Sequence, residues 1–282
     1  MENLIANNGR LQKHNVATKL NYWDDPGDGS PPTPIFIGKG RITNERPHLK
    51  HNVVVSDITG DEQQYTLDSH GFQYCQHTSI EKDFLDDAAI EASYYPECAS
   101  FLRSITGASH IHIFNHKVRR GPTHWHHLGL KNLANRGPVT KTHVDQSYIG
   151  AELRLRHEFP DKADDLVKKR YQIINVWRPI KTILKDPVAV ADASSVPDVD
   201  LVGAVMVEDG YAGESWVVRH NPEHKWYFKH RLSPNEVLLI KCFDSEEKVA
   251  RRALHSAFED DAYRDMESRQ SIEVRCLVLY DG

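Results

Sequence analysis

The sequence predicts a mainly β protein with flanking helices, built on a double-stranded β-helix, or jelly-roll, core. From Pro34 onward, short runs of β-branched and aromatic residues follow one another, and Gly, Asp and Asn separate them. The predicted helices do not alternate regularly with these runs, as they would in a parallel α/β sheet. A closed or double-sheet β architecture therefore fits the pattern best.

The chain of 282 residues carries no internal repeat and no clear linker, so residues 1–282 are expected to form a single domain. Residues 1–33 contain the turn-rich stretch Asp24–Pro32 and few apolar residues. We expect this segment to be a surface or partly mobile N-terminal lead.

The first predicted strands are Ile35–Ile37, Val53–Ile58, Tyr65–Leu67 and Phe72–Tyr74. One or two helices are expected over Ile80–Ile105, because Thr78 and Glu81 have capping-box spacing and apolar residues recur among charges. Residues 109–118 alternate as a strand does, and residues 117–141 form a basic loop. Helices at 148–159 and 161–169 precede further strands at 171–180, 201–207, 215–219, 225–228, 237–243 and 271–279.

Composition excludes several classes of function. A formal net charge of -5 argues against a nucleic-acid-binding surface. No apolar stretch is long enough to span a membrane, and the first ten residues do not resemble a signal peptide, so a cytoplasmic protein is expected. The four cysteines are far apart, which disfavours a zinc knuckle or a redox pair and favours buried free thiols.

The strongest chemical signal is His143-Val144-Asp145. In an extended segment, residues two apart project from the same face, so this imidazole and carboxylate can bind one metal in adjacent positions. Completed by a distant histidine, they form the facial triad of oxygen-activating iron(II), which leaves coordination positions open. Chance could supply one such pair in a chain with 17 histidines, so the assignment depends on the other residues.

The last predicted strand carries Arg269, Ser271 and Arg275 on one face. Arginine binds a carboxylate through a planar fork and stays charged, so these residues suit the distal carboxylate of 2-oxoglutarate. Buried arginines without an anionic partner are costly, which supports a ligand here. The alternative is that the arginines pair with Glu273 or point outward.

Two histidines compete for the third ligand position. His255 lies between the apolar run at 237–243 and the final strand, whereas Ser233-Pro234-Asn235, a turn signal, follows His220. Choosing His220 would also leave two predicted strands outside the barrel. We therefore predict His143, Asp145 and His255 as the metal ligands.

Several stretches resemble the fungal gibberellin desaturase-like and cephalosporin 7α-methoxylase-related proteins of the iron(II)/2-oxoglutarate oxygenase superfamily. The most specific are RGPVTKTHVDQS, NVWRPI and LIKCFDS, at residues 136–147, 175–180 and 239–245, and the resemblance extends over most of the chain after residue 50. It implies a double-stranded β-helix dioxygenase that uses Fe(II), 2-oxoglutarate and O2 on a small secondary metabolite. Succinate and CO2 would be released, and hydroxylation, desaturation and cyclisation all stay open.

By position, the resemblance gives His143, Asp145 and His255 as iron ligands and Arg269 with Ser271 as the co-substrate anchor. Arg275 matches a second arginine near 2-oxoglutarate in related demethylases. Further candidates for substrate contact or support of the site are Arg178, Asn175, His116, Gln146 and Tyr148. A structural ion pair for Arg178 and a core hydrogen bond for His116 are the competing interpretations.

Three other interpretations are less favoured. His124, His126 and His127 could bind a second metal, but no cysteine or acidic residue lies near them in the sequence. The barrel could instead bind a metal or ligand without catalysis, or the same His/Asp cluster could serve a zinc hydrolase. A small-molecule partner, and neither nucleic acid nor membrane, is expected.

Overall fold

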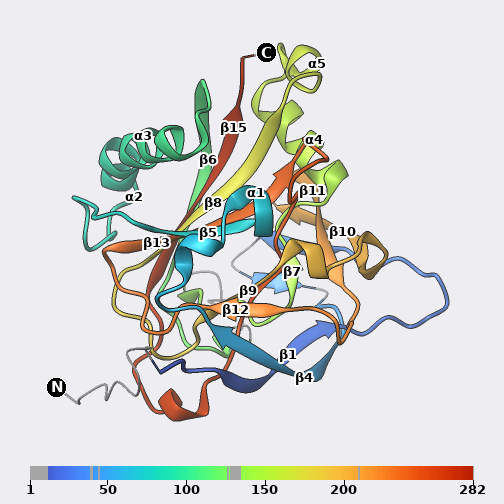
Figure 1. The fold of residues 1–282 in the computed structure, drawn as a ribbon. Helices are drawn as coiled ribbons and strands as arrows, with labels where there is room; N and C mark the ends of the chain where they lie inside the picture. The colour runs from blue at the N-terminus through green and yellow to red at the C-terminus, as the bar shows by residue number, and fades with distance from the viewer. Residues whose placement is uncertain are drawn as a thin grey trace.

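Two β-sheets make up most of the molecule in the computed structural model, which describes residues 12–38, 41–43, 45–125, 127, 135–208 and 210–281. The smaller sheet has five antiparallel strands in the described part of the chain. Their order is β5 (Phe72–Gln76), β13 (Glu236–Asp244), β8 (Tyr171–Pro179), β15 (Ser271–Leu279) and β6 (His110–Arg119). The long central strands run up through the molecule in Figure 1.

The larger sheet has ten strands within the same described ranges. In spatial order they are β1 (Val16–Trp23), β4 (His48–Asp57), β12 (Trp226–Phe228), β9 (Val188–Ala191), β14 (His255–Ala257), β7 (His143–Val144), β11 (Tyr211–Val218), β10 (Leu201–Glu208), β2 (Ile35–Gly38) and β3 (Arg41–Thr43). A bridge between Asn21 and Lys141 brings β1 beside the segment that leads into β7.

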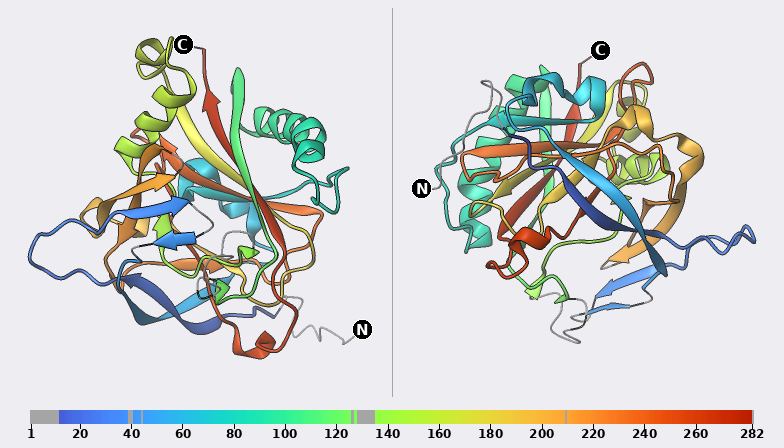
Figure 2. Two further views of the ribbon diagram at one scale, coloured as in Figure 1. Left: turned by 180° about the vertical axis from the view of Figure 1, so that it is seen from behind. Right: turned by 60° about the horizontal axis from the view of Figure 1, so that its bottom comes forward.

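The two faces of the five-stranded sheet have different partners because side chains alternate along each strand. Ile174 and Val176 of β8 pack with Val274 of β15 and with Leu102 on one face. That face is covered by α2 (Asp87–Ala89), a π-helical turn at Ile90–Tyr94 and α3 (Tyr95–Thr106), and α3 lies outside β6 in Figure 2. The opposite face turns toward the larger sheet and holds the polar residues described below.

The remaining helices are short. They are α1 (Leu67–His70), α4 (Tyr148–Glu158) and α5 (Ala163–Leu166), with 3-10 turns at Glu62–Gln64, Ala193–Ser195, Asp198–Asp200 and Asp261–Tyr263. Ser147 caps α4 by accepting a hydrogen bond from the Gly150 amide at 2.8 Å. A Cβ at Gly150 would lie 1.9 Å from the Glu214 carbonyl oxygen, so the packing of α4 on β11 requires glycine.

The longer sequence-predicted strands and the helix at α4 are confirmed, and β15 has the predicted bounds. Residues 65–67 do not form the expected strand, because Thr66 begins α1 in a capping box with Ser69. The expected capping box at Thr78 is also wrong: Glu81 accepts hydrogen bonds from the amides of Asp83 and Phe84 before the first helix.

The expectation that residues 1–33 form a surface or mobile lead is wrong for part of that segment. Val16–Trp23 is a sheet strand paired with β4, and Leu20 and Tyr22 are fully buried. Their apolar side chains occupy one face of the strand, and they pack with Val55 and Trp226 in the main core cluster. The composition of the segment was misleading because the turn-rich stretch Asp24–Pro32 lowers its apolar content and hides the strand before it. The expected helix at 161–169 is shorter, at Ala163–Leu166.

Candidate metal centre

Strand pairing brings the three predicted metal ligands together. His143 in β7 is the direct antiparallel partner of His255 in β14, and their ring centroids lie 4.4 Å apart. Asp145 follows β7 immediately, with its Oδ1 3.5 Å from His143 Nε2. One ligand atom from each residue lies within 4.8 Å of the others. Among the described residues, this is the one convergent group of three or more His, Cys, Asp or Glu side chains.

Backbone carbonyls fix the orientation of both imidazoles. His143 Nδ1 donates to the Lys141 carbonyl at 2.7 Å, and His255 Nδ1 donates to the Ala253 carbonyl at 3.3 Å. Each ring therefore carries its proton on Nδ1 and presents the lone pair of Nε2 to a metal. Burial lowers the pKa of His255 to about 4, so its ring is neutral at physiological pH.

Asp145 is held by two donors from the five-stranded sheet. Asn175 in β8 donates to Asp145 Oδ2 at 2.6 Å, and Arg275 in β15 donates to Oδ1 at 3.1 Å. Burial alone would raise the pKa of Asp145, but the neighbouring Arg275 charge outweighs burial and holds it well below its usual value. The carboxylate is thus charged and oriented before a metal binds.

The small cavity at the candidate ligands is also lined by the charged residues Arg119, Arg269 and Glu273. Arg269 is 5% exposed and donates from Nη1 to the Asp186 carbonyl, but its Nε has no partner. Ser271 is 1% exposed and its hydroxyl is also unpaired. Burial, with the neighbouring Arg119 charge, lowers the pKa of Arg269 to about 9.

These unpaired buried donors test whether the residues fit 2-oxoglutarate. Buried polar groups are nearly always hydrogen-bonded, and a buried guanidinium without an anion is costly. A carboxylate at this end of the cavity would accept from both Arg269 Nε and Ser271 Oγ. The donor set therefore fits a keto acid whose other end reaches the His/Asp group.

The segment before His255 is extended although its residues, Ala250–Leu254, favour helix. The Ala250 amide donates to the Asp68 carbonyl, and the Ala253 amide donates to the Lys241 carbonyl, both at 2.8 Å. The Ala253 carbonyl in turn accepts from His255 Nδ1. The backbone of β13 at Lys241 therefore positions the His255 imidazole through Ala253.

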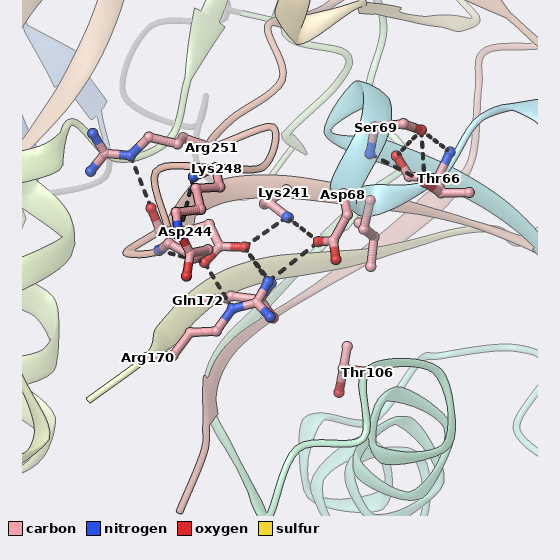
Figure 3. Close-up of polar contacts among 12 residues, drawn as sticks. Thr66, Asp68, Ser69, Thr106, Arg170, Gln172, Lys241, Asp244, Lys248 and Arg251 are labelled. Atoms are coloured by element: carbon pink, nitrogen blue, oxygen red, sulfur yellow. Dashed lines mark hydrogen bonds and ion pairs between the residues drawn. The ribbon is translucent and has the colours of Figure 1, made fainter. Parts of the chain in front are cut away.

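Lys241, whose carbonyl accepts from Ala253, also belongs to a network of charged side chains (Figure 3). Lys241 and Asp244 of β13 are fully buried, and Lys241 Nζ lies 2.7 Å from Asp244 Oδ2 and 2.9 Å from Asp68 Oδ1. Arg170 Nη2 completes the set at 2.9 Å from Asp244 Oδ2. The charges of two cations and two carboxylates cancel, so we interpret this network as one that stabilises the fold.

Of the five secondary candidates, Asn175 reaches the centre through Asp145. Arg178 does not: it lies on the face of β8 that turns toward the helices, and it donates to the Tyr94 hydroxyl and to the carbonyls of His77 and Pro234. The expected grip on a ligand is wrong because Arg178 has the parity of Ile174 rather than of Asn175.

His116 is likewise on the helix-facing side, where it hydrogen-bonds the Tyr95 hydroxyl at 2.8 Å and Asp87 at 3.2 Å. Tyr148 begins α4, donates to Asp198 and packs against Trp216, so it is not a pocket residue. Both expectations are therefore corrected. Gln146 is buried beside Asp145 in sequence, but it is absent from the residues that line the cavity.

Arg275 needs a different role from the one expected. Its Nη2 contacts Asp145 at 3.1 Å and Glu273 at 2.9 Å, so two carboxylates already neutralise it. Pairing with Glu273 thus describes Arg275 but not Arg269. These contacts favour Arg269 over Arg275 as the co-substrate anchor, and Arg275 orients Asp145, the candidate metal-binding carboxylate.

The rival ligand His220 lies elsewhere, stacked on His51 with ring centroids 3.9 Å apart. His124 and His127 belong to no convergent metal group, and His126 lies outside the described residues. Two charged lining residues were missed by the sequence reasoning. Glu273 shares the parity of Ser271 and Arg275, which could have revealed it, whereas Arg119 is found only because β6 pairs it with Ser271.

Comparison with known proteins agrees with this geometry. A family model described as oxidoreductase/YMDC permease-like domain matches residues 20–279. The hydroxylase/desaturase efuI of Hormonema carpetanum is 36% identical, and the alignment covers 96% of this chain and 97% of that protein. The alpha-ketoglutarate-dependent dioxygenase tstK of Talaromyces stipitatus is 33% identical over 93% of this chain and 96% of its own length.

The chain belongs to this hydroxylase/desaturase family of Fe(II)/2-oxoglutarate-dependent dioxygenases. A solved structure of the iron and alpha-ketoglutarate-dependent endoperoxidase NvfI superposes with a TM-score of 0.82 at 23% identity, covering 95% of this chain and 98% of that one. It confirms the jelly-roll fold predicted for this dioxygenase family member. Within the described ranges, none of its helices has the length and apolar character that a membrane crossing requires.

Proposed function

We propose that this dioxygenase hydroxylates or desaturates a small-molecule secondary metabolite, with His143, Asp145 and His255 as the iron ligands. The observation that carries the proposal is the pairing of two preformed donor sets in one cavity. Two imidazoles and a carboxylate converge on the cavity, and Arg269 lines the same cavity with an unpaired Nε. Ser271, two residues further along the chain, has a buried and unpaired hydroxyl.

Iron(II), 2-oxoglutarate and O2 would supply the oxidising power that breaks a substrate C–H bond, with release of succinate and CO2. The chain's own residues orient and charge this assembly. His143 and His255 present Nε2, Arg275 and Asn175 keep Asp145 ionised and aimed, and Arg269 binds the far carboxylate. Trp177 and Val188 supply apolar walls that limit water in the cavity.

The names of the relatives support a small organic substrate. They include hydroxylase/desaturases and, at 26% identity, the gibberellin cluster GA4 desaturase of Gibberella fujikuroi. A cytoplasmic location and the absence of nucleic-acid or membrane partners stay predictions from the sequence, as does a single domain over residues 1–282.

The test is anaerobic reconstitution with Fe(II) and 2-oxoglutarate. We expect a visible charge-transfer band that requires both, followed by succinate formation on admission of O2. His255→Ala should abolish both signals. A wild-type protein that binds zinc in preference, gives no band and forms no succinate would refute the proposal and favour a hydrolase or a non-catalytic barrel.

A further inference from the structure

A large cleft lies next to the metal cavity, and nothing described so far accounts for it. Its volume is about 1240 Å³, and it is bordered by β1, β4 and β12 and by the chain on either side of the metal ligands. Ala257, two residues after His255, lines both the cleft and the metal cavity. Val139 lines the cavity and its neighbour Thr140 lines the cleft, so the two spaces share a wall.

Strand register connects the cleft to the metal ligands. Lys141 lies two residues before His143 and therefore on the same face of the extended chain. Lys141 bridges to Asn21 in β1, and Asn21 pairs directly with Lys50 in β4. Side chains of laterally paired residues share a face. With strands roughly 5 Å apart and residues roughly 3.3 Å apart along a strand, the backbone at Lys50 lies within about 20 Å of His143.

Three lysines in the cleft have no carboxylate to neutralise them. Lys19 and Lys50 lie on the cleft face of the β1–β4 pair, and Lys225 precedes β12. Throughout the described ranges, no ion pair is formed by any of them. The other two cations in the wall are engaged: Lys141 lies 3.5 Å from Glu45, and Arg264 lies 2.6 Å from Asp261.

One acidic residue of the lining, Glu259, opposes these three lysines without an ion pair of its own among the described residues. The wall therefore carries an excess of positive charge, although the whole chain has a net charge of -5. Such a local excess in a concave site attracts anions. Asn52, the cross-strand partner of Lys19, adds an amide donor on the same face.

Apolar surface in the same wall argues against a simple inorganic anion. Val54, the cross-strand partner of Ala17, is 60% exposed, and Tyr227 and Phe258 also line the cleft. A cleft with apolar walls and a few convergent polar groups is typical of organic ligand sites. The volume is at the upper end of the usual range for such sites.

We propose that this cleft binds the organic substrate and that the substrate is a carboxylic acid with a multi-ring or long apolar carbon skeleton. Its carboxylate contacts Lys19 and Lys50, with Lys225 nearby, while the skeleton extends past Ala257 toward the metal ligands. This inference rests on the proposed function, which it extends by naming the substrate class and the residues that select it.

A matched pair of fluorescent probes tests the inference without the natural substrate. 8-Anilinonaphthalene-1-sulfonate carries an anionic oxygen group, which stands in for the carboxylate, and N-phenyl-1-naphthylamine has the same rings without it. Both are titrated into the protein loaded anaerobically with Fe(II) and 2-oxoglutarate. The anionic probe should bind the unaltered protein at least tenfold more tightly than the neutral one.

The decisive variant is the double substitution Lys19→Glu with Lys50→Glu. It should raise the dissociation constant of the anionic probe at least tenfold and change that of the neutral probe less than twofold. Lys82→Glu with Lys169→Glu is the matched control, because both lysines are exposed, have no ion pair in the described ranges and are absent from the cleft wall. This control makes the same change in net charge, and the dissociation constants of both probes should stay within twofold of those for the unaltered protein.

The charge-transfer band is recorded in every sample, so the two ideas can fail separately. If the band forms and the cleft variant binds both probes as the control does, the carboxylate inference is overturned while the proposed function stands. Loss of selectivity in the control as well would also overturn it, because net charge alone would explain the result. Absence of the band in unaltered protein would instead refute the proposed function.

Discussion

Replacing Ser271 by alanine separates binding of the co-substrate from stability of the fold. The Ser271 hydroxyl is buried without a hydrogen-bond partner. Removing it therefore breaks no hydrogen bond and relieves the cost of an unsatisfied polar atom, which is about 1–3 kcal/mol. We expect the protein without co-substrate to be as stable as the wild type or slightly more stable.

With 2-oxoglutarate bound, the same substitution has the opposite consequence. A hydrogen bond to a charged group contributes about 1.5–3 kcal/mol, which corresponds to roughly a 10- to 150-fold loss of affinity. The dissociation constant is measured by titrating 2-oxoglutarate into the anaerobic Fe(II) protein and following the charge-transfer band. Affinity for Fe(II) should not change, because Ser271 does not contact the His/Asp group.

Ser79→Ala is the matched control, since Ser79 is 3% exposed, has an equally unpaired hydroxyl and lies between β5 and α2, away from Arg269 and Ser271 in the chain. It should leave 2-oxoglutarate affinity unchanged. Equal affinity in Ser271→Ala and wild type would show that the hydroxyl does not meet the co-substrate. A marked loss of stability in Ser271→Ala would contradict the unpaired state on which the reasoning depends.

Four further outcomes are expected. His255→Ala should abolish succinate formation whereas His220→Ala should retain it, since His220 stacks on another ring away from the centre; activity assays of both variants decide this. Arg178→Lys should lower the free energy of unfolding by about 2–3 kcal/mol without raising the KM for 2-oxoglutarate, because the side chain donates only to Tyr94 and to neighbouring backbone and ring groups. Lys241→Met should cost about 1.5–3 kcal/mol in urea unfolding, because it removes one of the two cations that contact the fully buried Asp244; a loss below 1 kcal/mol would contradict the network. In metal-free protein the pKa of His255 is about 4, against about 6.5 in the unfolded chain. Its contribution to the free energy of unfolding is therefore complete above pH 6.5 and falls by about 1.4 kcal/mol per pH unit toward pH 4. His255→Gln should flatten this pH dependence in urea unfolding.

The sequence predicted the long strands because their apolar residues extend over many positions. β15 had the predicted bounds, and Arg269 and Ser271, which share a parity, both have a buried donor without a partner. The ligand histidines followed from spacing and from the position of His255 before the last strand. Those features are local, so one segment at a time is enough to detect them.

The failures come from pairings that no single segment reveals. β7 has two residues and β14 has three, which is too short for any periodic pattern, although both carry ligands. Arg178 was placed inward because its strand is buried on both faces, so burial alone did not show which side faces the cavity. Arg275 was judged without knowing that Asp145 would lie beside it.

The direct pairing of His143 with His255 couples metal capture to the completion of folding. The two residues are roughly 110 positions apart in the chain, and bringing such distant segments together is the slow part of assembling a β protein. A slip of one residue in either short strand would turn an imidazole to the opposite face. Iron held by these residues would therefore bind tightly only to chains that have reached the correct alignment, and by mass action it would stabilise that alignment over every misaligned alternative.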